Sequence, residues 1–277
     1  MRTRSSTDQA RHEAGSQFYA GLAGDLAGIA DDRPPLVFVH GLTFNRSTWA
    51  PVLDELAHVD PGRRILNLDL PGHGQSQPAP PHSFAATITR LRRAVDEAGL
   101  QAPVVVGHSM SGGLASLYAS AHPTRGIINV DAPPDLATSA RLLQSVADQI
   151  LGPGFAAVWR MMADSFHLEL LPPAARMLVE SASRPEPELV RSYWQELLTT
   201  PPEQLQAAVA VAMRDITDAH LPYLLILGAE PPPTARAALE VGLPGATVQV
   251  WSDSGHFPHL AHPRRFAEQL AASARWQ

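Results

Sequence analysis

Short apolar runs alternate along most of the chain with segments whose apolar residues recur every three or four positions. The runs predict buried strands, and the longer spacing predicts amphipathic helices. The predicted strands are 36–40, 65–70, 104–106, 127–131, 222–228 and 247–251, with an edge hairpin around 17–19 and helices at 49–56, 84–95, 114–121 and near 266–270. This alternation predicts an α/β fold, a mostly parallel sheet with helices on both of its faces.

The alternation stops between residues 133 and 220. Only helical spacing is found there, and proline pairs at 133–134, 172–173 and 201–202 separate the helical segments. We therefore expect an all-helical cap, residues 133–220, inserted between strands of a core domain that consists of residues 1–132 and 221–277.

Composition narrows the classes of function. Cysteine is absent and all 21 basic residues are arginine, which excludes disulfides, thiolate zinc sites, a cysteine nucleophile and a Schiff-base lysine. A net charge of −6 without a basic patch gives no basis for nucleic-acid binding. The polar stretch 1–13 is not followed by an apolar run, and no run approaches the roughly 20 residues that span a bilayer. We expect a cytoplasmic protein without membrane contact, as a monomer or homodimer.

One stretch carries candidate chemistry. Residues 104–113, VVVGHSMSGG, predict a strand, a tight turn and the start of a helix, with Ser109 at the tip of the turn. Such a corner lifts a hydroxyl above the sheet and aims the next backbone N–H at the same point. Ser109 is therefore the predicted nucleophile, although Ser111 stands where this motif most often has glycine.

Four motifs in this order resemble the α/β-hydrolase family: His40-Gly41, the stretch DLPGHGQS at 69–76, the corner at Ser109, and Gly255-His256-Phe257-Pro258. The resemblance covers about residues 34–270. It implies that His256 is the base and that His40, Asp69, His73 and His108 hold loops.

The resemblance also implies an oxyanion hole. Its two donors are the backbone N–H groups of Leu42 and Met110, and Gly41 permits the close approach.

The acid that orients the histidine is left open between two residues. The position that carries it in most relatives is Pro231, which cannot serve. Glu230 is one candidate. Asp131, at the end of an earlier strand, is the other and is favoured, because haloalkane dehalogenases and zearalenone-type lactonases carry their acid at a similar place.

These residues predict a serine hydrolase that cleaves a carboxylic ester or lactone of a hydrophobic small molecule through an acyl-enzyme, with no cofactor and no metal. Serine at the corner rules out the aspartate-nucleophile relatives. A zearalenone-type macrolactone hydrolase is a sharper alternative, and a non-catalytic ligand-binding module is another. The predicted substrate contacts are apolar residues of the cap and of the histidine loop: Trp159, Met162, Phe166, Trp194 and Phe257.

Overall fold

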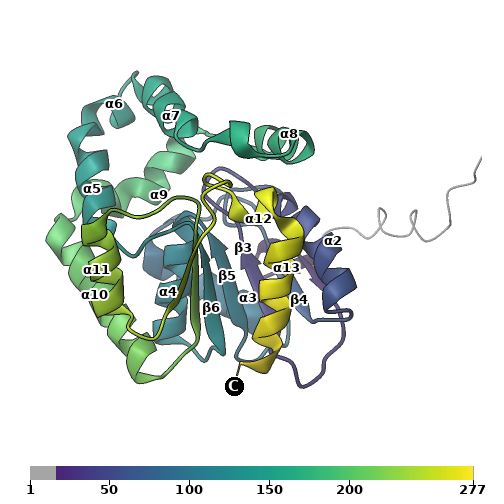
Figure 1. Ribbon diagram of the computed structural model, residues 1–277. Helices are drawn as coiled ribbons and strands as arrows, with labels where there is room; N and C mark the ends of the chain where they lie inside the picture. Colours follow the sequence, from purple (N-terminus) through teal and green to yellow (C-terminus); the bar gives the residue numbers. More distant parts are fainter. Residues whose placement is uncertain (1–16, 277) are drawn as a thin grey trace, which may run out of the picture.

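The computed structural model describes residues 17–276. Within this part, eight strands form one sheet at the centre of the molecule (Figure 1). The charged stretch 1–13 lies outside the described residues. The spatial order of the strands is β1-β2-β4-β3-β5-β6-β7-β8. Their bounds are β1 Gln17–Tyr19, β2 Leu22–Ala27, β3 Leu36–Val39, β4 Ile65–Leu68, β5 Val104–His108, β6 Gly126–Val130, β7 Tyr223–Leu227 and β8 Thr247–Val250.

The strands from β4 across to β8 are parallel, and only the hairpin of β1 and β2 joins the sheet antiparallel. The mostly parallel sheet is as predicted. Parallel strands bring their carboxyl ends to one edge, where the loops that follow β3, β5 and β6 meet. This edge is the place for a site.

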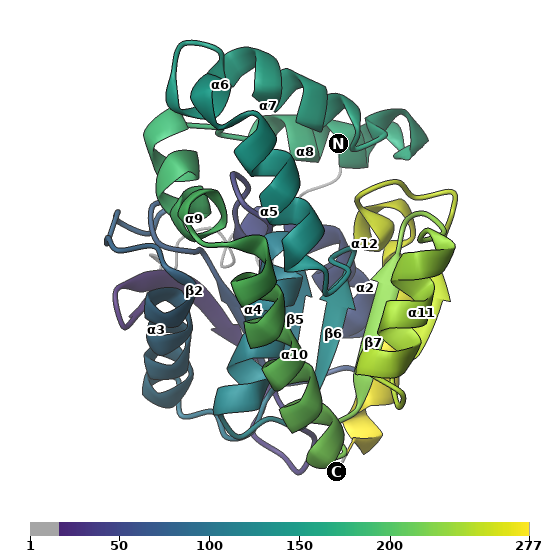
Figure 2. The ribbon, with the colours of Figure 1, turned by 90° about the vertical axis from the view of Figure 1, so that its left-hand side faces the viewer.

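Alternate side chains of each strand supply two separate cores. Leu36 and Phe38 of β3 belong to the core on one face, and Val37 and Val39 belong to the core on the other. Helices α2 (Ala50–Val59) and α13 (Pro263–Ala272) cover the first face. The short α12 (Pro258–Ala261) packs against these two helices. Helices α3 (Phe84–Glu97) and α4 (Met110–Ala121) cover the second, where α11 (Pro233–Gly242) also contributes (Figures 1 and 2).

Between β6 and β7 the chain, described throughout, forms only helices and turns. The helices are α5 (Leu136–Ser145), α6 (Ala147–Leu151), α7 (Phe155–Asp164), α8 (Pro173–Ala182), α9 (Pro187–Thr199) and α10 (Pro202–Asp218). Helices α5 to α9 lie over the carboxyl edge of the sheet, whereas α10 runs down beside α4 and packs against both α4 and α5 (Figure 2). No helix in the described part of the chain is long and apolar enough to cross a bilayer.

Candidate active site

Ser109 stands at the sharp corner between β5 and α4. Its φ of 56° and ψ of −131° are unusual for a residue other than glycine and are a mark of stored strain. Its N–H donates to the carbonyl of Val130 (2.8 Å), which holds the corner against β6. Gly107 lets the helix approach the strand, because a Cβ there would lie 1.9 Å from the carbonyl oxygen of Ser111. The Ser111 hydroxyl, at the position where glycine is commonest, donates to the carbonyl of His40 (2.5 Å).

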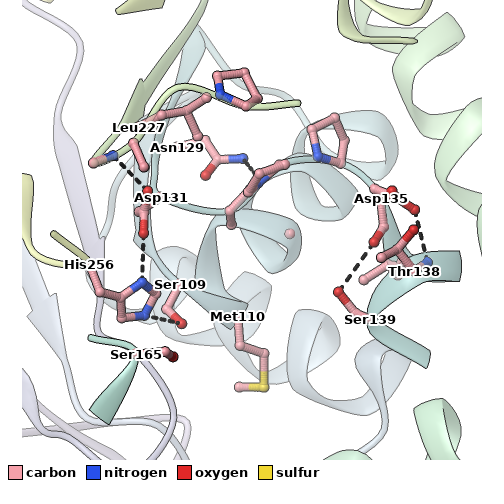
Figure 3. A pocket seen from close by; sticks show the side chains of 18 of the residues that line it. Ser109, Met110, Asn129, Asp131, Asp135, Thr138, Ser139, Ser165, Leu227 and His256 are labelled. Carbon is pink, nitrogen blue, oxygen red and sulfur yellow. Dashed lines mark hydrogen bonds and ion pairs between the residues drawn. The ribbon is translucent and has the colours of Figure 1, made fainter. Parts of the chain in front are cut away.

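A continuous chain of hydrogen bonds starts at this serine (Figure 3). The Ser109 hydroxyl donates to Nε2 of His256 (2.9 Å), and Nδ1–H of the same ring donates to Oδ2 of Asp131 (2.6 Å). Oδ1 of Asp131 accepts from the N–H of Gly228 (2.8 Å). Burial alone raises the pKa of Asp131, but the hydrogen bonds from His256 and Gly228 outweigh it and hold this pKa below its usual value. Asp131 is therefore a half-buried carboxylate facing an imidazole.

The structure brings Asp131, and not Glu230, to His256. The Glu230 side chain is 61% exposed and forms an ion pair with Arg236 of α11. It lines the same cavity as Ser109 but contacts neither the serine nor the histidine among the described hydrogen bonds. Of the two candidate acids, only Asp131 has the geometry to orient the imidazole.

Two neighbours fix the position of His256. Burial lowers the pKa of His108 to about 3, so this imidazole is neutral and its Nε2–H donates to the carbonyl of His256 (2.8 Å). The N–H of His256 donates to the carbonyl of Phe166 (3.1 Å), and the Phe166 ring stacks on the imidazole with centroids 4.8 Å apart. The histidine loop is thus attached both to β5 and to the segment that follows α7.

The three residues predicted for an oxyanion hole surround Ser109. A Cβ on Gly41 would lie 2.9 Å from Nδ1 of His108 and 3.2 Å from Cβ of Ser109, so glycine permits this close approach. Leu42 and Met110 both line the cavity in front of the serine. Met110 is the first residue of α4, so its N–H has no hydrogen-bond acceptor within the helix. The N–H that follows Leu42, on Thr43, donates to Nε2 of His73 (3.0 Å), which fixes this loop.

Buried polar residues beneath the site hold loops, as the sequence predicts. The N–H of Leu70 donates to Nε2 of His40 (3.0 Å), and burial lowers the pKa of His40 to about 4. Burial likewise lowers the pKa of His73 to about 3. The carboxylate of Asp69, fully buried, pairs with Arg46. Among the described residues no group of three histidine or carboxylate side chains is placed to hold a metal ion.

A cavity of about 910 Å³ opens between Ser109 and the helices that connect β6 to β7. Four of the predicted substrate contacts line it, namely Trp159, Met162, Phe166 and Trp194. The prediction for Phe257 is wrong, because this side chain is fully buried and its ring packs on Phe44 and His108 rather than facing the cavity.

The cavity is also lined by residues that the sequence does not predict as substrate contacts. The described lining contains no arginine, and its polar residues include Asp135, Thr138 and Ser139 on the side away from His256 (Figure 3). Gly113 and Leu117 also line it, on the face of α4 that begins with Met110. They lie three and seven residues after Met110, a helical spacing that is the only signal in the sequence that could have indicated them.

The chain is similar to known proteins over most of its length. The model of the alpha/beta hydrolase family matches residues 36–269. A pimeloyl-[acyl-carrier protein] methyl ester esterase of Vibrio vulnificus is 26% identical over 255 residues, which are 87% of this chain and 94% of that protein. An esterase of Thermogutta terrifontis is similar in structure, with a TM-score of 0.57, 26% identity and coverage of 92% and 93% of the two chains.

A haloalkane dehalogenase of Bradyrhizobium elkani has a TM-score of 0.70 at 20% identity, over 94% of this chain and 96% of that one, a likeness that concerns the fold alone. The fold and family predicted from the sequence are confirmed. The chain belongs to the alpha/beta hydrolase family and is an enzyme of the hydrolase class.

Proposed function

We propose that this enzyme is a serine hydrolase that cleaves a carboxylic ester of a hydrophobic small molecule through an acyl-enzyme. The observation that carries the proposal is the hydrogen-bonded chain from Ser109 through His256 to Asp131, opening onto an apolar cavity. The esterases among the relatives support ester chemistry. We do not retain a non-catalytic binding module, because nucleophile, base and acid stand together in bonding distance.

In the first half of the reaction, Oγ of Ser109 attacks the ester carbonyl carbon while Nε2 of His256 takes the hydroxyl proton. Asp131 stabilises the imidazolium that forms. The negative oxygen of the tetrahedral intermediate accepts hydrogen bonds from the N–H groups of Leu42 and Met110. As the intermediate collapses, the proton on Nε2 passes to the leaving alcohol and the acyl group stays on Ser109.

The second half repeats these steps with water. His256 removes a proton from a water molecule that attacks the acyl carbon, and the tetrahedral intermediate expels Ser109, which regains its proton from the imidazolium. The products are a carboxylic acid and free enzyme. In a lactone the same steps apply, but the leaving alcohol remains attached to the acyl chain.

The lining of the cavity supports an uncharged, apolar substrate. Most of the lining residues between β6 and β7 are apolar, with leucine, proline, tryptophan and methionine among them. The described lining holds no arginine with which to bind an anionic group. A macrolactone is a second candidate, favoured by the volume of the cavity and by the acid at the end of β6, the position that resembles zearalenone-type lactonases.

The proposal is tested with p-nitrophenyl esters, aromatic macrolactones and acyl thioesters, and with a fluorophosphonate that labels activated serines. We expect the wild type to hydrolyse apolar esters with a burst of p-nitrophenol and to react with the probe, and Ser109→Ala to lose both. Ser139→Ala, which removes another serine from the cavity lining, is the matched control and keeps both. A wild-type enzyme with neither turnover nor labelling refutes the proposal.

A further inference from the structure

Gly113 faces open space inside the cavity. It lies on α4, four residues after Ser109, and is half-buried. A Cβ built on it has no heavy atom within 4 Å outside its own helix backbone, although Gly113 lines the cavity. The preceding Gly112 is different, because a Cβ there would lie 2.2 Å from Oδ1 of Asn129. Packing therefore requires glycine at position 112 and not at position 113.

The backbone does not require glycine at position 113 either. Gly113 is within a regular helix and its φ is outside the left-handed region. Glycine is among the least favourable residues for a helix, because it loses the most backbone freedom on folding. A residue that weakens the helix and relieves no clash has one evident effect here, which is to leave a space unfilled.

That space is part of an apolar wall. Met110 and Leu117 lie three residues before and four residues after Gly113, on the same face of α4, and both line the cavity. Helices of the segment between β6 and β7 supply further apolar lining, including Leu143 of α5, Leu197 of α9 and Met213 of α10. Since α10 packs against α4, the unfilled space lies where the core and the cap segment meet.

We propose that Gly113 determines the length of the apolar chain that the enzyme accepts, and that the acyl or alkoxy chain of the substrate occupies the space beside it. The inference rests on the proposed esterase function. Four residues of helix rise about 6 Å, so Gly113 lies about one turn along α4 from the nucleophile. A side chain at position 113 obstructs a substrate chain that extends from the reacting carbonyl along this face.

The test compares Gly113→Ala and Gly113→Leu with the wild type on two series of esters. One series lengthens the acyl group, from p-nitrophenyl acetate to octanoate, and the other lengthens the alcohol of acetate esters. We expect Gly113→Leu to keep kcat/KM for the shortest esters and to lose roughly fourfold for each methylene it excludes, in one of the two series. Gly113→Ala shows a smaller loss and a Tm about 2 °C higher, because alanine strengthens the helix.

Ala121→Leu is the matched control. It adds an apolar side chain to the exposed end of the same helix, outside the cavity lining, and keeps the wild-type profile in both series. If Gly113→Leu lowers Tm by more than a few degrees, Gly113→Ala decides the outcome. A variant that folds and shows the wild-type dependence on chain length in both series overturns the inference. A wild type that cleaves none of the esters refutes the proposed function instead, and the inference with it.

Discussion

Replacing Asp131 with asparagine tests the assignment of the acid, because the surrounding hydrogen bonds dictate how the new amide would sit. The N–H of Gly228 donates to Oδ1 of Asp131, so the amide oxygen keeps that position. The amide nitrogen then takes the place of Oδ2, 2.6 Å from Nδ1 of His256. An N–H facing Nδ1 favours the tautomer with its proton on Nε2, and that nitrogen can no longer accept the proton of Ser109.

The size of the loss follows from this wrong tautomer. In a serine protease the same change lowers kcat by about 10⁴, and here we expect 10³ to 10⁴. At about 1.4 kcal/mol for each factor of ten, this is about 4 to 5.5 kcal/mol of transition-state stabilisation. Glu230→Gln is the matched control, because it removes a carboxylate that is exposed and pairs with Arg236. We expect its kcat to stay within about twofold of the wild type.

The assay is steady-state hydrolysis of an apolar p-nitrophenyl ester, with circular dichroism to show that both variants fold. Fluorophosphonate labelling of Ser109 slows in Asp131→Asn, because labelling also needs the imidazole to accept the proton. A folded Asp131→Asn enzyme with near wild-type kcat refutes the reasoning. If Glu230→Gln instead shows the large loss, the acid is Glu230 and the loop must rearrange on substrate binding.

Two further predictions concern stability and the cap. Burial lowers the pKa of His40 to about 4 and those of His73 and His108 to about 3, whereas unfolded histidine titrates near 6.5. Below about pH 6.5 the unfolded state therefore binds more protons than the folded state. As the pH decreases below this value, the free energy of unfolding decreases by up to about 4 kcal/mol per pH unit for three groups. Urea denaturation that gives equal free energies of unfolding at pH 7 and pH 5 contradicts this. Trp159→Ala and Trp194→Ala each lower kcat/KM roughly 5- to 30-fold for long apolar esters and less for acetate. Unchanged kcat/KM for all esters would show that these side chains do not contact the substrate.

The sequence predicts what depends on neighbouring residues. Apolar runs indicate the parallel strands, and the Gly/Ser turn indicates the corner at Ser109, because both patterns are local. The choice of the acid depends on distances that no local pattern encodes, since Asp131 and His256 are 125 residues apart in the chain. Glu230 is closer in sequence, but α11 begins soon after it and places Arg236 to pair with its carboxylate.

The structure differs from the sequence-based prediction in two further places, each for a physical reason. The sequence predicts no helix between 228 and 247, yet α11 begins at Pro233, because proline is tolerated in the first turn of a helix, where its missing N–H has no partner to lose. The second difference is Phe257, which the sequence analysis predicts to contact substrate. Neighbouring residues in a loop point in different directions, and this ring turns inward onto Phe44. Loop orientation comes from tertiary packing.

The three residues of the proposed triad, Ser109, His256 and Asp131, are held in two different ways. Ser109 and Asp131 each follow a strand with φ of 56°, and each donates its N–H to the next strand, at Val130 (2.8 Å) and Ile226 (2.8 Å). The ladder of the sheet therefore extends one residue beyond β5 and β6 and stabilises two strained conformations. His256 has no such ladder.

The loop of His256 is held by His108 on one side and, on the other, by the carbonyl of Phe166, beyond the end of α7. Phe166 also stacks on the imidazole and lines the cavity, so one residue touches both the base and the space for the substrate. Ser109 and Asp131 are held by hydrogen bonds to the sheet, whereas His256 is held in part by this segment. The sheet thus positions the nucleophile and the acid, whereas the base is positioned by Asp131, His108 and Phe166 together.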